Sequence, residues 1–115
     1  MQIEFQEVSN LIRFNFYKKN HMHILQIEHP VPNYDGWKKA FDSDPINRKQ
    51  SGVRRYKISR KIDNPNYVII DLEFDVLNQA EACHAALRNL WNRVEGTVMN
   101  NPQARIIEVV ENKEY

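Results

Sequence analysis

The segment VRRYKISRKIDNPNYVIIDLEF, residues 53–74, constrains the fold more than any other part of the sequence. Apolar and polar residues alternate on both sides of the turn sequence DNPN, which is typical of two antiparallel strands joined in a hairpin. We predict the register in which Lys57 lies opposite Asp71 and Arg55 opposite Glu73, because one face of the hairpin is then ion-paired and the other apolar. The same register pairs Ile58 with Ile70 and Tyr56 with Leu72.

The patterns around this hairpin follow a regular order. The alternating segment MHILQIEH and the prolines after it predict a first strand, and Asn33 is a suitable N-cap for a helix behind it. Apolar residues three and four apart predict a long helix from Ala80 to about Gly96, and ARIIEVVENKEY predicts a last strand. The order is β-α-β-β-α-β, the ferredoxin-like pattern of the α+β class, in which two helices cover one face of an antiparallel sheet.

We expect the core to lie between the apolar face of this sheet and the two helices. The opposite face carries charges of both signs and is either solvated or in contact with another subunit. In the last strand apolar residues fall on both faces, which favours a strand covered on both sides and therefore a dimer. The predicted core residues are Leu25, Ile27, Tyr56, Ile58, Val68, Ile70, Leu72 and Phe74 from the strands, and Trp37, Phe41, Leu87 and Trp91 from the helices.

Length and composition bound the class of protein. A chain of 115 residues supports one domain, which we place at 22–115. The net charge of +1 gives no overall field that would attract nucleic acid, and the single cysteine fits a reducing compartment. The sequence has no apolar run of the ~20 residues that a membrane span needs and no signal-peptide pattern, so we expect a soluble cytoplasmic protein with no membrane partner.

Residues 1–21 stand outside the ferredoxin-like pattern. The segment LIRFNFYKK alternates and could add a strand at an edge of the sheet or reach a partner subunit. The alternative is upstream sequence that is translated in some contexts only. Neither interpretation assigns a function to this N-terminal extension.

Several stretches of the chain together resemble a known superfamily. HILQIEHPVPNYDGWKKAFDSDP, SGVRRYKISR, NYVIIDLEFD and ARIIEVVE resemble small proteins of the dimeric α/β barrel superfamily, which includes antibiotic biosynthesis monooxygenase-like proteins. The resemblance spans residues 22–112 and implies a ferredoxin-like protomer whose sheet pairs with that of a second protomer in a barrel. Members include cofactor-independent oxygenases, isomerases, haem-binding enzymes and proteins of unknown activity. The resemblance therefore implies an architecture and a pocket between sheet and helices, and it carries over no catalytic residue.

The clustered histidines do not predict a metal site. His23 and His29 are six positions apart on one strand, about 20 Å, so they cannot share an ion. His21 and His23 have a spacing that can chelate, but a zinc site normally needs a third protein ligand. Cys83 and His84 are adjacent on a helix and point about 100° apart, so they cannot form a nucleophile pair. We predict no metal and no cofactor.

His29 is the candidate catalytic residue with the clearest position. It shares the parity of Leu25 and Ile27 and therefore points toward the helices at the end of its strand, where an imidazole could act as a general base or orient a substrate oxygen. A structural hydrogen bond is the commoner role for such a histidine. Tyr56, on the same face, is a second catalytic candidate for which core packing is the commoner role.

Three further residues are candidates for substrate binding. Trp37 and Trp91 are core anchors that would also suit a flat aromatic substrate if a cavity lies between them. Arg48, with Lys49, lies in the connector before Gly52 and is the part of a basic run best placed to meet an anionic ligand. That run, residues 48–61, is split between the two faces of a strand, so we predict no nucleic-acid partner.

Two function hypotheses remain. The first is a small homodimeric enzyme, a cofactor-independent oxygenase or isomerase that acts on a small apolar or aromatic substrate. The second is a non-enzymatic small-ligand-binding or regulatory dimerisation module of the same shape. A roomy cavity with a perturbed His29 would favour the enzyme, and a filled core without convergent polar groups would favour the module.

Overall fold

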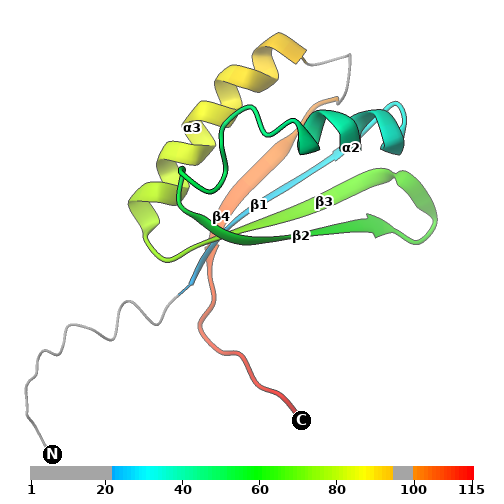
Figure 1. Cartoon of the computed structure of the whole chain (residues 1–115). Coiled ribbons are helices and arrows are strands. Elements are labelled where there is room, and N and C mark those ends of the chain that lie inside the picture. Colours follow the sequence, from blue (N-terminus) through cyan, green and yellow to red (C-terminus); the bar gives the residue numbers. More distant parts are fainter. Residues whose placement is uncertain (1–21, 95–99) are drawn as a thin grey trace, which may run out of the picture.

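The computed structural model describes residues 22–94 and 100–115, so the predictions made for residues 1–21 and for Gly96 lie outside it. Its elements are β1 (His23–Pro30), α2 (Tyr34–Asp42), β2 (Val53–Lys61), β3 (Asn64–Phe74), α3 (Leu77–Val94) and β4 (Gln103–Glu108). The strands form an antiparallel sheet in the order β2-β3-β1-β4, and both helices lie on the same face of it (Figure 1). The predicted ferredoxin-like α+β fold is confirmed. In this part of the chain no helix is both long enough and apolar enough to cross a bilayer.

The predicted register of the β2–β3 hairpin is confirmed. Lys57 pairs with Asp71 and Arg55 with Glu73 along the ladder. Their side chains form ion pairs, with Nζ to Oδ2 of 3.6 Å for the first and Nη1 to Oε1 of 2.6 Å for the second. The charge pattern of the sequence therefore predicts which residues face each other across the two strands.

Two strand ends differ from the prediction. The hairpin turns at residues 62–63 instead of at DNPN, because a register irregularity between Arg60 and Lys61 lets β3 start at Asn64. The last strand ends at Glu108 instead of continuing to residue 115. Glu108 pairs with the first residue of β1, so the β1–β4 ladder has no further partner residue in β1.

The core lies between the sheet and the helices as predicted, with one exception. Tyr56 is 46% exposed, so the expectation that it is buried is wrong. It lies on the edge strand β2, where its ring meets that of Phe41 edge-on with 5.0 Å between centroids. The helices cover the middle of the sheet more completely than this edge (Figure 1). The buried apolar residues are Leu25, Ile27, Val31, Trp37, Val68, Ile70, Leu72, Phe74, Ala80, Cys83, Leu87 and Trp91.

Among the described residues no helix lies on the other face of the sheet, which is crossed by a chain of polar contacts. Tyr67 donates its hydroxyl to Glu28 (2.8 Å), and Arg105 forms an ion pair with the same carboxylate. Arg105 Nε donates to Gln26 Oε1 (3.0 Å), and Gln26 Nε2 donates to Asp71 Oδ1 (3.0 Å). The hydrogen bonds from Arg105 and then Tyr67 lower the pKa of Glu28. These contacts join β4, β1 and β3 across the open face.

Candidate functional site

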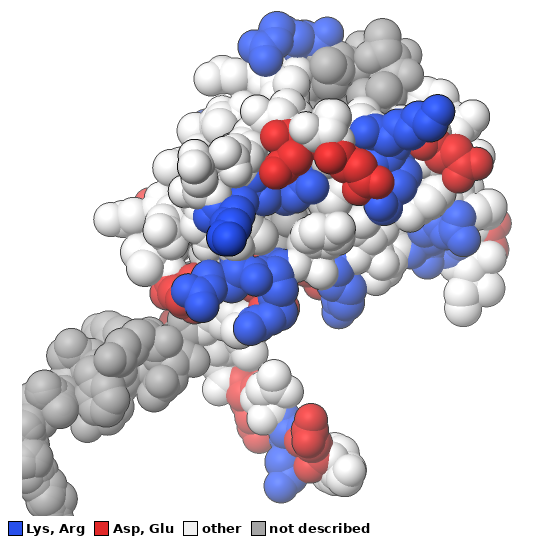
Figure 2. All heavy atoms as spheres, in the orientation of Figure 1, with Lys and Arg blue, Asp and Glu red and all other residues white. Residues whose placement is uncertain are grey.

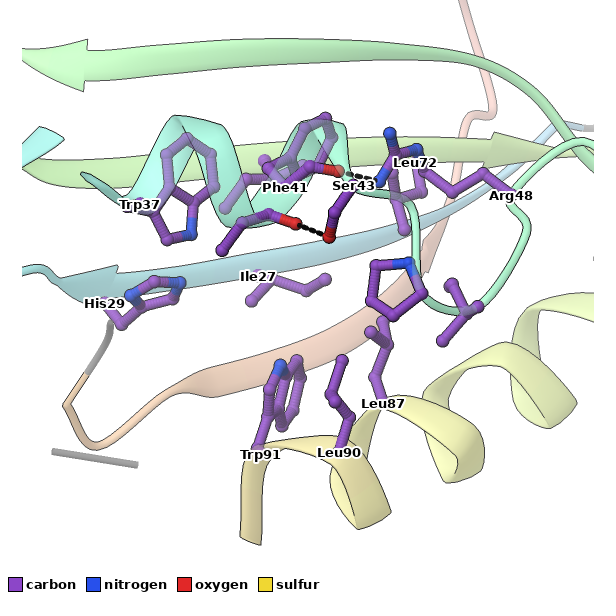
Figure 3. A pocket seen from close by; sticks show the side chains of 14 residues that line it. Ile27, His29, Trp37, Phe41, Ser43, Arg48, Leu72, Leu87, Leu90 and Trp91 are labelled. Carbon is purple, nitrogen blue, oxygen red and sulfur yellow. Dashed lines mark hydrogen bonds between the residues drawn. The ribbon is translucent and has the colours of Figure 1, made fainter. Parts of the chain in front are cut away.

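A cavity of about 260 Å³ lies between the two helices and the helix-facing side of the sheet (Figure 3). Its wall is mainly aromatic and aliphatic, and the polar side chains in it are few, as is usual for small-molecule sites. The lining residues are Ile27, His29, Trp37, Ala40, Phe41, Ser43, Pro45, Ile46, Arg48, Ile70, Leu72, Leu87, Leu90 and Trp91.

The start of helix α2 is set by a local signal that the sequence contains. The side chain of Asn33 accepts a hydrogen bond from the backbone N–H of Gly36 (2.9 Å), which satisfies one of the free donors in the first turn. The N–H of Tyr34 donates to Asn66 Oδ1 (3.0 Å) and ties this end of the helix to β3. With this start, Trp37 and Phe41 fall one turn apart on the cavity side, with 5.2 Å between their ring centroids.

His29 lies in the wall of the cavity, on the side that its strand parity predicts. It is 2% exposed, and its ring meets the ring of Trp37 edge-on at 6.1 Å. Nδ1 lies 3.1 Å from the carbonyl oxygen of Pro30. Since a carbonyl oxygen only accepts hydrogen bonds, Nδ1 must carry the proton. In the neutral ring the lone pair is then on Nε2.

Two observations describe the state of this imidazole. Burial lowers the pKa of His29, and the hydrogen bond to Pro30 opposes this effect more weakly, so the neutral form is favoured at pH 7. Nε2 has no hydrogen-bond partner among the residues described. His29 therefore presents a basic, unpaired nitrogen in an apolar wall.

The connector after α2 folds back against the helix and completes the wall. Asp44 and Asn47 both have a φ of 54°, a left-handed conformation that Asp and Asn adopt more readily than most residues. The Asp44 side chain accepts from the backbone N–H of Arg48 (2.9 Å), and Ser43 Oγ donates to the carbonyl of Ala40 (2.6 Å). These turns bring residues 43–48 over the end of the cavity.

Arg48 is held at that end by four contacts, one of which is with the Tyr56 ring, 5.3 Å from Cζ to its centroid. Nη1 donates to the carbonyl oxygen of Phe41 (3.0 Å), which also accepts from the backbone N–H of Asp44 (3.1 Å) at the end of α2. Cζ lies 3.8 Å from the centroid of the Phe41 ring, within range of a cation–π interaction. Asp44 Oδ1 is 3.5 Å from Nη1. The Arg48 side chain is 14% exposed, so a cation is placed in a largely dry position.

Helix α3 supplies the opposite wall, including Trp91, and does not supply a nucleophile. Burial raises the pKa of the Cys83 thiol to about 11, and Cys83 does not line the cavity. The His84 ring packs near Trp91, at 6.3 Å, outside the cavity. Within residues 22–94 and 100–115 no three His, Cys, Asp or Glu side chains come together to hold a metal ion.

The structure leaves Tyr56 outside the cavity that the other predicted site residues line, although its ring centroid lies 5.3 Å from Arg48 Cζ. The cavity is lined by His29, Trp37, Arg48 and Trp91. Tyr56 instead lines an open hollow on the outer side of the connector, which we call the outer hollow. Its lining residues are Asp44, Arg48, Lys49, Gln50, Gly52, Val53, Arg54, Arg55, Tyr56, Asp75, Val76 and Gln79.

The basic run over residues 48–61 is divided as its strand parity predicts. Arg60 lies over the ring of Tyr34 on the helix side, and Lys61 lies over the ring of Tyr67 on the other side. Arg54 forms an ion pair with Asp75 at 3.0 Å. Figure 2 shows basic and acidic side chains interspersed on the face it presents.

Sequence reasoning named Arg48 in the connector but missed the other residues that this segment contributes to the cavity. Ser43, Pro45 and Ile46 line it, although the segment DSDPINRKQSG indicates only a break between a helix and a strand. The signal that could have revealed this is the spacing of Asp44 and Asn47, two residues that tolerate a left-handed backbone.

Comparison with known proteins gives matches among solved structures alone. No protein-family model matches the sequence, and no curated protein matches it. A candidate antibiotic biosynthesis monooxygenase from Nitrosomonas europaea is similar with a TM-score of 0.59 at 15% identity, over 77% of this chain and 90% of that one. A dimeric ferredoxin-like protein from an uncultured marine organism has a TM-score of 0.58 at 11% identity, over 85% and 96%. SnoaB, a cofactor-independent oxygenase from Streptomyces nogalater, has a TM-score of 0.61 at 8% identity, over 80% and 95%.

These similarities concern the fold. The chain has the same fold as antibiotic biosynthesis monooxygenase-like and dimeric ferredoxin-like proteins, so the resemblance seen in the sequence is confirmed at that level. At identities of 15% and below, the matches transfer no activity and no residue roles.

Proposed function

We propose that this protein is a small homodimeric enzyme that removes a proton from a small, flat, largely apolar substrate held between sheet and helices, without a cofactor. The observation that supports this is His29, a buried imidazole in an apolar wall with its Nδ1 proton held by Pro30 and its Nε2 unpaired. A general base needs an available lone pair and a neutral form at the working pH, and both the unpaired Nε2 and the lowered pKa of His29 support this role.

The chemistry begins with one proton transfer. His29 Nε2 takes a proton from an acidic C–H of the substrate, and the substrate keeps the electron pair as a carbanion or enolate. Return of the proton to another carbon gives an isomer. If the carbanion attacks O2 instead, a C–O bond forms, and the proton returned by His29 completes a hydroperoxide. Both routes use the same base, and the geometry of the cavity does not distinguish between them.

The indoles define the shape of the proposed substrate. Trp37 from α2 and Trp91 from α3 lie on opposite sides of the cavity (Figure 3), where they suit a flat ring system. A bound apolar substrate would displace water from this wall, which would strengthen the electrostatic effect of the few polar groups. Tyr56, which lies outside this cavity, has no part in the proposed step.

A test uses 2-tetralone, a small bicyclic ketone whose C1 protons are acidic. Nuclear magnetic resonance follows the loss of the C1 proton signal in D2O. Wild-type protein should exchange these protons faster than buffer does, and His29→Gln should lose about 100-fold or more of this acceleration, the usual contribution of a general base. The matched control is His84→Gln, since His84 lies outside the cavity and should leave the rate unchanged.

The outcomes separate the two hypotheses of function. Exchange that persists in His29→Gln at the wild-type rate would show that His29 is not the base. Binding of 2-tetralone without any accelerated exchange would favour the non-enzymatic binding module. Binding is measured by the fluorescence of the tryptophans in the cavity wall.

A further inference from the structure

The two ends of the cavity differ in chemistry, and this difference limits what can occupy it. His29 and Arg48 lie at opposite ends of the row of lining side chains, with Ile27 and other apolar groups between them (Figure 3). The His29 end offers a lone pair, and the Arg48 end offers N–H donors and a positive charge. An occupant of matching polarity would be a proton donor at one end and an anion at the other.

The hydrogen-bonding capacity of Arg48 is only partly used. A guanidinium carries five N–H donors. Among the described residues Nη1 donates to Phe41 and lies near Asp44, and neither Nε nor Nη2 has a partner. The Arg48 side chain is 14% exposed, and its unpartnered nitrogens are not among the buried unsatisfied atoms of the described residues, so they can be reached from solvent or by a ligand. A largely buried cation with unused, reachable donors favours an anionic acceptor.

Asp44 does not satisfy this cation. Its Oδ1 is 3.5 Å from Arg48 Nη1, longer than a charge-assisted hydrogen bond, and its side chain is 36% exposed. The same carboxylate already accepts the backbone N–H of Arg48 at 2.9 Å. A ligand anion can therefore bind Arg48 while Asp44 stays hydrated and hydrogen-bonded.

Arg48 also separates the cavity from the outer hollow, because it lines both. Lys49, which lines only the outer hollow of the two, forms no ion pair with any residue in the described ranges. The acid Asp75 in that hollow is paired with Arg54 at 3.0 Å. An anionic group beside Arg48 would thus face a positively charged exit to solvent.

We propose that the substrate is an aromatic acid of one or two rings, whose carboxylate binds Arg48 and whose reactive proton lies at His29. This inference rests on the proposed function and narrows its substrate class. The size follows from the cavity of about 260 Å³, which equals the share of liquid volume of about nine water molecules. The bidentate fork of Arg48 suits the planar geometry of a carboxylate.

The test compares three probes with the same ring system: 6-hydroxy-2-naphthoate, its methyl ester of nearly equal size, and the smaller 2-naphthol. Trp37 and Trp91 are the two tryptophans of the chain and both line the cavity, so quenching of their fluorescence reports its occupancy. The wild-type protein should bind the acid about 10- to 100-fold more tightly than the ester, as expected for one charge-assisted hydrogen-bonded pair. This comparison requires no variant.

Two substitutions locate the effect. Arg48→Met should bring the acid-to-ester ratio of dissociation constants close to one while 2-naphthol binds as before, and Arg48→Lys should recover part of the preference. Lys49→Met is the matched control, because Lys49 does not line the cavity, and it should keep the wild-type ratio. Circular dichroism checks that each variant is folded.

Each outcome decides something different. Equal binding of the acid and the ester by the wild-type protein would overturn the aromatic acid and leave the proposed base His29 in place. An acid preference that survives in Arg48→Met would overturn the role of Arg48. If none of the three probes quenches the tryptophans, both the acid and the proposed function are wrong.

Discussion

Burial sets the chemistry of the ionisable side chains near the centre of the molecule. His29 is 2% exposed and Cys83 is 3% exposed, and in each case the apolar surroundings favour the neutral form. For the histidine this leaves a base that is not protonated at neutral pH, and for the cysteine it leaves an unreactive thiol. Burial therefore keeps His29 in the form that can accept a proton and keeps Cys83 in the form that does not react as a nucleophile.

The lowered pKa of His29 predicts a pH-dependent stability. Burial places its folded-state pKa below the ordinary value of 6.5. Between the two values the unfolded chain binds a proton that the folded chain does not, so the free energy of unfolding should fall as the pH is lowered from about 7.5 to about 5.5. Urea unfolding across this range should show a smaller decrease for His29→Gln. The pKa of His84 is also lowered, by burial and then by Arg88, so His84→Gln is the comparison. An unchanged slope in His29→Gln would contradict the prediction.

The raised pKa of Cys83 predicts slow thiol–disulfide exchange. With a pKa of about 11 the thiolate is scarce at pH 8, and the native protein should react with a disulfide reagent at least about 100-fold more slowly than free cysteine. The measurement is the absorbance of released thionitrobenzoate, with urea-unfolded protein as the control that reacts rapidly. Complete reaction of the folded protein within minutes would show that the thiol is accessible.

At the scale of the elements, the connector between α2 and β2 decides whether the fold encloses a cavity. It ends at Gly52, whose φ of +100° is a conformation that other residues adopt with strain. A Cβ built on Gly52 would lie 2.5 Å from Gln79 Cδ in α3. The connector thus approaches α3 closely at this point because the residue has no side chain.

The different surroundings of Gly52 and Gly36 predict that substitution by alanine changes the free energy of unfolding in opposite directions. Gly52→Ala should lower the free energy of unfolding by about 1–2 kcal/mol, because the strain of the positive φ remains even if the Gln79 side chain moves aside. Gly36→Ala should raise it by up to about 1 kcal/mol, since Gly36 lies in α2 and a Cβ there would be 3.6 Å from Asn33 Oδ1, an ordinary contact. Chemical denaturation measures both. A Gly52→Ala protein as stable as the wild type would show that the connector can relax.

At the scale of the whole molecule, the sheet is covered by helices on one face only (Figure 1). Apolar Ile24, Ile69 and Ile107 lie on the other face beside the polar chain that runs through Glu28 and Arg105, and Ile107 is 39% exposed. Proteins of this fold from uncultured marine organisms are described as dimeric. We therefore propose that the open face packs against the same face of a second copy.

This proposal predicts a dimer of two 13.7 kDa chains that a single charge can break. Ile69→Lys should shift the protein to a monomer in analytical ultracentrifugation, because Ile69 lies in β3 opposite Glu28, whose carboxylate is already paired with Arg105, and a lysine there would bring an additional charge into the apolar part of the interface. Ile62→Lys is the control, since Ile62 is fully exposed in the hairpin turn. A wild-type protein that sediments as a monomer would contradict the proposal.

The sequence by itself determined the elements, the hairpin register and the side of the sheet on which His29 lies. These depend on periods of two and 3.6 residues, on local caps such as Asn33 and on charge pairs between neighbouring strands, all of which can be read along the chain. The tertiary structure alone decided that Arg48 enters a dry wall, that residues 43–46 complete the cavity and that Tyr56 stays outside it. Those outcomes depend on how α2, α3 and the folded-back connector pack over the sheet. When distant segments bury a side chain, the sequence around that residue shows no periodic pattern that would predict the burial.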